Sequence, residues 1–217
     1  MTRVKKGDFI EVDYIGRVTG TGVIFDLTDE KIAKEQHVHR EKAQYGPVII
    51  CVGEIQILPG IDENLVGKEI GKSYTINLTP DNAFGKKDAQ LIKIVPLSVF
   101  HKQNIQVFPG MQVAVDQLFG IVRVVSGGRV IVDFNHPLAG KEVYYEITLL
   151  RIIEDKQEQI KSFFKFLGIN VESQIEGNKV ALSFDQKLPE QIKKELETRI
   201  KRLVKVEEVE FKTTTRA

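Results

Sequence analysis

Few side chains of this sequence have the types and spacing that support chemistry. His37 and His39 alternate in the segment HVH, so both could face one side of an extended segment and bind a metal. No further cluster of Cys, His or carboxylates accompanies them, and we expect a solvated loop without a metal. The sequence also lacks a Walker loop, a CxxC pair, a G-x-S-x-G elbow and an HExxH helix. We therefore expect no cofactor.

Two other polar residues, Tyr14 and Asp26, lie in strand-like segments. Tyr14 belongs to the alternating run DFIEVDYIGRV, and Asp26 ends the run VIFD that follows a glycine-rich turn. Taken alone, Tyr14 is typical of an ordinary strand aromatic and Asp26 of a turn residue. Their chemistry depends on the segments around them.

Composition narrows the class of protein. The 217 residues include 31 basic and 30 acidic side chains, a net charge of +1, which argues against a dedicated nucleic-acid binder. The single Cys51 lies in the apolar run VIICVG, so we expect a core residue and no disulfide framework. The polar N-terminal segment has no apolar signal region and no run is long enough to span a membrane, which predicts a soluble, cytoplasmic protein without a membrane partner.

The first 85 residues have mostly strand patterns. The segments DFIEVDYIGRV, GTGVIFD, GPVIICVGE and SYTINLTP predict strands, and ILPGIDENLVGKEIGK predicts one short helix. The charged segment TDEKIAKEQHVHREKAQYG predicts a surface loop with about one helical turn.

Residues 86–131 differ in character. Their net charge is +4 but charges are sparse, while Ile, Val, Leu and Phe are abundant. The runs VFPGMQVAVDQ, FGIVRVVS and RVIVDF predict strands, and hence a small all-β unit. Most of these apolar residues could fill the core of the unit, but so small a unit can hardly bury all of them.

From Asp155 the apolar period becomes helical. Ile160, Phe163, Phe164 and Leu167 form one stripe, and Gly168 is placed to end the helix. Two strands flank EGNK, a second helix follows Pro189, and the run VEEVEFK alternates like a strand. This pattern predicts a C-terminal α+β module.

Five segments, in their order and spacing, resemble those of a known protein family. The segments VDYIGRV, VIFD, GPVIICVGEIQILPGIDENLVG, TPDNAFG and NHPLAGKEVYYEITLL closely resemble the FKBP-type peptidyl-prolyl cis/trans isomerases, and more narrowly the SlyD-like branch. The resemblance covers residues 1 to about 154. In that branch, the flap that follows AFG is replaced by an inserted chaperone domain.

We expect an α+β fold with three parts, of which the resemblance implies the first two and the helix and strand patterns predict the third. Residues 1–85 with 132–154 would form an FKBP-like antiparallel β half-barrel around a short helix. Residues 86–131 would form the insert-in-flap chaperone domain, and their exposed apolar side chains would bind unfolded chain. Residues 155–217 would form a separate α+β domain.

The resemblance also places a prolyl site. Five residues would enclose the proline ring, with Ile61 as its floor: Phe25, Val48, Ile57, Ile61 and Tyr145. The Leu58 N–H would hold a substrate carbonyl, Asp26 would lie near the carbonyl that precedes the proline, and the Tyr14 hydroxyl would bond Asp26. A buried carboxylate needs such a partner.

Three positions depart from the wider family. Phe84 stands where many members have a tyrosine that bonds the substrate carbonyl, and a lost neutral hydrogen bond costs about 0.5–1.5 kcal/mol. Ile61 replaces an indole, and Tyr145 replaces a phenylalanine. We therefore expect modest activity on small peptides and poor binding of macrolide inhibitors.

Our interpretation is a folding factor that isomerises X-Pro bonds in unfolded or partly folded polypeptides. The first alternative is a non-catalytic holdase with a degenerate prolyl pocket. The second is a nucleic-acid- or ribosome-associated factor that uses the C-terminal module. That module could also form a homodimer, although the glutamates of VEEVEFK discourage strand pairing.

Overall fold

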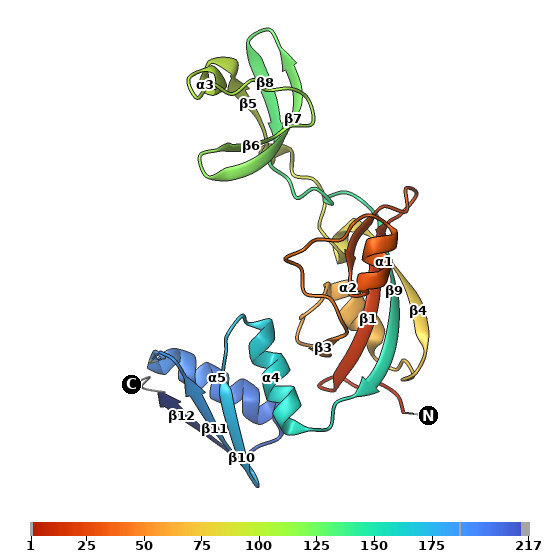
Figure 1. The fold of residues 1–217 in the computed structure, drawn as a ribbon, viewed down its shortest axis with the longest axis vertical. Helices are drawn as coiled ribbons and strands as arrows, with labels where there is room; N and C mark the ends of the chain where they lie inside the picture. Colours follow the sequence, from red (N-terminus) through yellow and green to blue (C-terminus); the bar gives the residue numbers. More distant parts are fainter. Residues whose placement is uncertain (1, 187, 214–217) are drawn as a thin grey trace. The chain divides into compact units, whose positions relative to one another are not determined.

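A computed structural model describes residues 2–186 and 188–213 and divides the chain into two compact units. We call Met1–Leu78 with Val143–Ala217 the terminal unit and Thr79–Glu142 the inserted unit. Figure 1 labels most of the helices and strands of both units. Within the described ranges, no helix is long and apolar enough to cross a membrane.

The first sheet of the terminal unit has the strand order β2-β1-β9-β4, and β3 pairs with β1 outside this path. All of its pairings are antiparallel. The strands are β1 (Phe9–Val18), β2 (Ile24–Leu27), β3 (Val48–Cys51), β4 (Ser73–Leu78) and β9 (Val143–Ile152). All the strands predicted in the first 85 residues are present.

Two short helices accompany this sheet. Helix α1 (Glu30–Glu35) begins at Asp29, whose carboxylate accepts the N–H groups of Lys31 and Ile32. Helix α2 (Pro59–Leu65) is the short helix predicted from ILPGIDENLVGKEIGK, and Pro59 suits its first turn. In α2 the buried Asp62 accepts the N–H groups of Gly53 and Ile55 at 2.8 and 3.0 Å. Asp62 thereby fixes the loop between β3 and α2.

The C-terminal segment adds a second sheet to the same unit. Strands β10 (Glu172–Glu176) and β11 (Lys179–Phe184) are antiparallel, and β12 (Glu208–Thr213) runs parallel to β11. Helices α4 (Lys156–Phe166) and α5 (Glu190–Val204) cover one face of this sheet (Figure 1). Asp155 caps α4 by accepting the Glu158 N–H at 2.7 Å.

The C-terminal segment, predicted to be a domain of its own, shares its core with the first sheet. Phe9, Cys51 and Ile153 belong to the same buried cluster as Phe163 and Phe164 of α4. Cys51 is fully buried, and burial raises the pKa of its thiol to about 12. At the edge of this contact, Glu54 accepts hydrogen bonds from Arg199 and Arg202 of α5 at 3.0 and 2.7 Å. Helix α4 is therefore held against the sheet that carries Tyr14.

The inserted unit is a four-stranded antiparallel sheet in the order β5-β8-β7-β6. Its elements are β5 (Ile92–Pro96), α3 (Leu97–His101), β6 (Gln112–Val115), β7 (Leu118–Ser126) and β8 (Arg129–Asp133). The sequence patterns predicted the last three strands but neither β5 nor the short helix α3. The core of the unit includes Phe100 of α3 together with Val122, Val130 and Val132.

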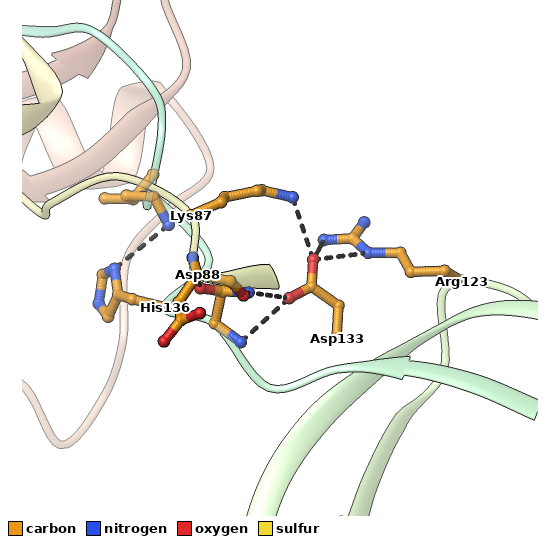
Figure 2. Close-up of polar contacts among 7 residues, drawn as sticks. Lys87, Asp88, Arg123, Asp133 and His136 are labelled. Atoms are coloured by element: carbon orange, nitrogen blue, oxygen red, sulfur yellow. Dashed lines mark hydrogen bonds and ion pairs between the residues drawn. The ribbon is translucent and has the colours of Figure 1, made fainter. Parts of the chain in front are cut away.

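A buried carboxylate ties the first and last segments of the inserted unit together (Figure 2). Asp133 is only 2% exposed and accepts hydrogen bonds from Lys87, Arg123 and Asn135. Asn135 in turn accepts the Asp88 N–H at 2.8 Å and donates to the Asp88 carbonyl at 2.9 Å. Burial alone would raise the pKa of Asp133, but the hydrogen bonds from Asn135, Lys87 and Arg123 lower it well below its ordinary value of 3.8.

We expect Asp133→Asn to destabilise the inserted unit by about 3 kcal/mol, because it leaves buried donors and two cations without their charged partner. The pKa of Asp133 is lower in the folded state than in the unfolded state. Its contribution to the free energy of unfolding is therefore present above pH 3.8 and is lost as the pH falls through the folded-state pKa. Hydrogen exchange of the β7 and β8 amides measures the effect. Asp116→Asn, at an exposed aspartate of the same unit, is the control. Equal protection in the two variants at neutral pH would contradict this role.

Candidate active site

Three aromatic rings meet on the first sheet. The Tyr145 ring lies 5.5 Å from the Tyr14 ring and 5.6 Å from the Phe25 ring, measured between centroids, and both pairs are tilted or edge-on. The contact follows from strand register, because Gly16 of β1 pairs with Asp26 of β2 on one side and with Tyr145 of β9 on the other. Strands β1, β2 and β9 thus bring together four of the predicted site residues: Tyr14, Phe25, Asp26 and Tyr145.

Gly16 makes this cluster possible. A Cβ atom at this position would lie 2.9 Å from Cζ of Phe25 and 2.9 Å from Cζ of Tyr145. Any larger residue would therefore force the two rings away from the strand. Gly16 is not among the predicted site residues, although a glycine inside a strand pattern is a sign of close packing above it.

The polar part of the cluster is a hydrogen-bonded pair. The Tyr14 hydroxyl donates to the Asp26 carboxylate, and burial together with the charge of Asp26 raises the pKa of Tyr14. Burial also raises the pKa of Asp26 above its ordinary value of 3.8, although the hydrogen bonds from Tyr14 and Leu27 and the charge of Arg40 act in the opposite direction. The carboxylate is therefore poorly solvated and only partly compensated, as is common at functional sites.

The predicted aliphatic residues lie on β3 and at the start of α2. Val48, Ile57 and Leu58 are half-buried, while Ile61 is fully buried. Val48, Ile57 and Tyr14 line one groove of about 480 Å³. The Leu58 carbonyl accepts the N–H groups of Ile61 and Asp62. Within the described ranges, the Leu58 N–H itself has no acceptor.

Other predicted residues do not line this groove. Phe25 and Asp26 line a separate hollow of about 360 Å³, which residues of the segment 37–45 close from the other side. Tyr145 and Ile61 are buried behind the surface. Phe84 belongs to the inserted unit, where its ring stacks on His136 with 4.7 Å between centroids.

The two histidines of the HVH segment lie in this second hollow. The His39 ring stacks on Tyr45 at 5.2 Å, and its Nε2 lies 3.3 Å from a carboxylate oxygen of Glu30. Among the residues that the structure describes, no group of three or more His, Cys, Asp and Glu side chains is placed to hold a metal.

The inserted unit exposes apolar side chains on its sheet. Ile94 is 65% exposed and pairs with Ile131, which also pairs with the exposed Val124, so the three residues form a row across β5, β8 and β7. At the hairpin between β6 and β7, Leu118 and Phe119 are exposed, and Phe119 is 79% accessible. The core of the unit therefore takes only part of its apolar residues, and several of the others are exposed, as is typical of surfaces that bind apolar segments.

Comparisons with known proteins show which sequences and structures this chain is similar to. A family model described as the IF domain of FKBP26 matches residues 93–138. A short-type peptidyl-prolyl cis-trans isomerase of Methanocaldococcus jannaschii is 32% identical over 144 residues, which cover 66% of this chain and 90% of that protein. The FKBP-type isomerase SlyD of Haemophilus influenzae is 28% identical, over 73% of this chain and 77% of SlyD. A crystal structure of the three FKBP domains of wheat FKBP73 shares 14% identity at a TM-score of 0.38, and the match spans 70% of this chain but only 41% of that one.

Proposed function

Since the chain belongs to the FKBP-type family of peptidyl-prolyl cis-trans isomerases, we propose that the cluster around Gly16 is its catalytic site and that the inserted unit captures the client. The chain is an isomerase, and its substrates are proline-containing polypeptides. The observation that carries the proposed site is the packing of Tyr14, Phe25 and Tyr145 around the poorly solvated Asp26.

The chemistry requires no nucleophile. Rotation about a prolyl amide meets a barrier of roughly 18–20 kcal/mol because the rotated bond loses its resonance. The rotated amide has less charge separation than the planar one, so an apolar site binds it preferentially. Val48, Ile57, Ile61 and the rings of Phe25 and Tyr145 would provide that environment.

The polar groups would act on the substrate carbonyls. The Leu58 N–H, which has no acceptor among the described residues, would hold one carbonyl in place. A negative charge at Asp26 beside the carbonyl that precedes the proline would disfavour the planar amide, whose oxygen carries partial negative charge, more than the rotated one. Tyr14 would fix the orientation of Asp26. Phe84 offers no hydroxyl, so we propose that activity on short peptides is modest.

The inserted unit would raise the local concentration of client. Its ends are joined to Leu78 and Val143, which pair at the ends of the neighbouring strands β4 and β9, and Tyr145 follows two residues later. A segment bound by the exposed row Ile94, Ile131 and Val124 is therefore tethered to the catalytic sheet. Such tethering raises effective concentration without new contacts at the site.

The edge strand β12 could support a homodimer. Two of its glutamates, Glu208 and Glu210, form ion pairs with Lys179 and Lys212, which reduces the charge that would oppose strand pairing. Dimerisation, a cytoplasmic location and the absence of nucleic-acid and membrane partners stay predictions.

We expect Asp26→Asn to lower isomerase activity on a proline-containing tetrapeptide about tenfold, because the charge beside the carbonyl is lost and a charge-assisted hydrogen bond is worth roughly 1.5–3 kcal/mol. The same change should leave thermal stability unchanged or raise it. The raised pKa of Asp26 means that its charge opposes folding above pH 3.8, and this cost falls as the pH is lowered.

Isomerisation kinetics and thermal melts at neutral pH test both expectations. Asp13→Asn, at an aspartate of β1 that bonds Thr28 instead, is the matched control and should retain activity. If Asp26→Asn kept full activity, or if it lost activity only in proportion to lost stability, the proposed role of Asp26 would be wrong.

A further inference from the structure

Helix α4 forms part of the groove that holds Tyr14, Val48 and Ile57. Five of its residues line the groove and follow helical spacing along one face: Glu158, Lys161, Ser162, Lys165 and Phe166. The opposite face of α4 buries Ile160, Phe163 and Phe164 in the shared core. The helix is thus anchored by one face and presents the other to the proposed prolyl site.

The groove is apolar but carries uncompensated positive charge. Pro47, Val48, Ile49, Ile57 and Phe166 supply its apolar surface, and the Phe166 side chain is 53% exposed. The carboxylate of Glu158 is already bound by Arg151, at 2.7 and 3.2 Å. In the part of the chain that the structure describes, neither Lys161 nor Lys165 has a carboxylate within ion-pairing distance.

We propose that this groove binds the client residues beside the proline, in an extended segment that carries an apolar side chain and a carboxylate. The proposal rests on the proposed prolyl site, because Tyr14, Val48 and Ile57 belong to both. Those shared residues make the groove continuous with the site, and the two free ammonium groups favour Asp or Glu over Lys or Arg in the occupant. The C-terminal segment thereby becomes part of the substrate site of the enzyme.

The test compares proline-containing peptides of about ten residues, extended on both sides of the proline with Glu, Ser or Lys, and a minimal tetrapeptide. We expect kcat/KM of the full-length protein to be about three- to tenfold higher for the Glu-extended than for the Lys-extended peptide at low salt, a range typical of two partly exposed charge pairs. The preference should decline as salt screens the lysines. Phe166→Ser should lower kcat/KM for peptides with an apolar flank.

Charge-reversal variants test whether Lys161 and Lys165 cause the preference among the extended peptides. Lys161→Glu and Lys165→Glu, singly and together, should abolish or invert the preference, measured as the ratio of kcat/KM for the Glu-extended and Lys-extended peptides. Lys194→Glu, on the exposed surface of α5, changes the net charge equally and should leave the preference intact. A protein that acts on no peptide would refute the proposed function itself.

Two results would overturn this inference and leave the proposed function intact. One is normal tetrapeptide isomerisation with no preference among the extensions. The other is a change of sedimentation coefficient in the Lys161→Glu and Lys165→Glu variants without a change in preference, which would identify the groove as a contact between two copies of the chain.

Discussion

Removal of the inserted sheet should abolish the suppression of client aggregation and lower catalysis of protein refolding about 100-fold, the scale of a lost tethering effect. Isomerisation of a tetrapeptide should change by less than about threefold, because none of the catalytic groups proposed on the first sheet is removed. The exposed apolar row of the inserted sheet would be absent, so a client would meet the catalytic sheet only by free diffusion.

The structure indicates where to cut. Asp88 and Asn135 are joined by two hydrogen bonds, so a short glycine-rich linker can replace residues 89–134 and close between them. The variant keeps Phe84 and His136. A milder variant, Phe119→Ser with Ile94→Ser, removes exposed side chains without touching the core and should reproduce part of the loss. Parallel loss of tetrapeptide activity and aggregation suppression would contradict the division of labour between the two units.

Substitution of Gly16 should impair the enzyme almost as strongly. A Cβ atom at Gly16 would press on Cζ of Phe25 and of Tyr145 at 2.9 Å, so the rings must move by several tenths of an ångström or more. Misplacement of catalytic groups by about 1 Å can cost 100-fold in rate. We expect Gly16→Ala to lower tetrapeptide kcat/KM about tenfold and Gly16→Val about 100-fold, on the same reasoning.

Gly120 offers a matched control. It also lies in a strand, and its added Cβ would clash even more closely, at 2.6 Å from Val132 and 2.7 Å from Phe134, but in the inserted unit. Overpacking of this kind costs about 1–3 kcal/mol, so Gly120→Ala should lower stability and spare tetrapeptide kinetics. If the two alanine variants lost equal fractions of isomerase activity, the position of Gly16 under the aromatic rings would not explain its effect.

Local sequence patterns were sufficient to predict most of the helices and strands. Alternation predicted β1 and β12, and the apolar stripe from Ile160 to Leu167 predicted α4, because one buried face imposes its period on the sequence. Strand β5 and helix α3 were not predicted, because IKIVPLSVFH is one short apolar run divided by Pro96. Neither the strand period nor the helix period continues long enough in it to be recognised.

The candidate site was only partly predictable. The family motifs led to Tyr14, Asp26 and Tyr145, which the structure brings together on three strands. They could not predict that α4 forms one wall of the groove, because that wall depends on packing between α4 and β3, which lie more than 100 residues apart in sequence. The same packing pairs Arg199 of α5 with Glu54, although Glu195 stands four residues earlier on the same helix. Interactions across the shared core thus override the local pattern.

The most direct test of the account is the refolding of a protein whose slow phase is limited by a trans-to-cis prolyl step, with the full-length chain at substoichiometric ratios. We expect the slow phase to accelerate in proportion to enzyme concentration, and the acceleration to be lost in Gly16→Val but kept in the control Asp13→Asn. A slow phase that stays unchanged while aggregation is still suppressed would show a client-binding protein without catalysis, and it would contradict the central claim.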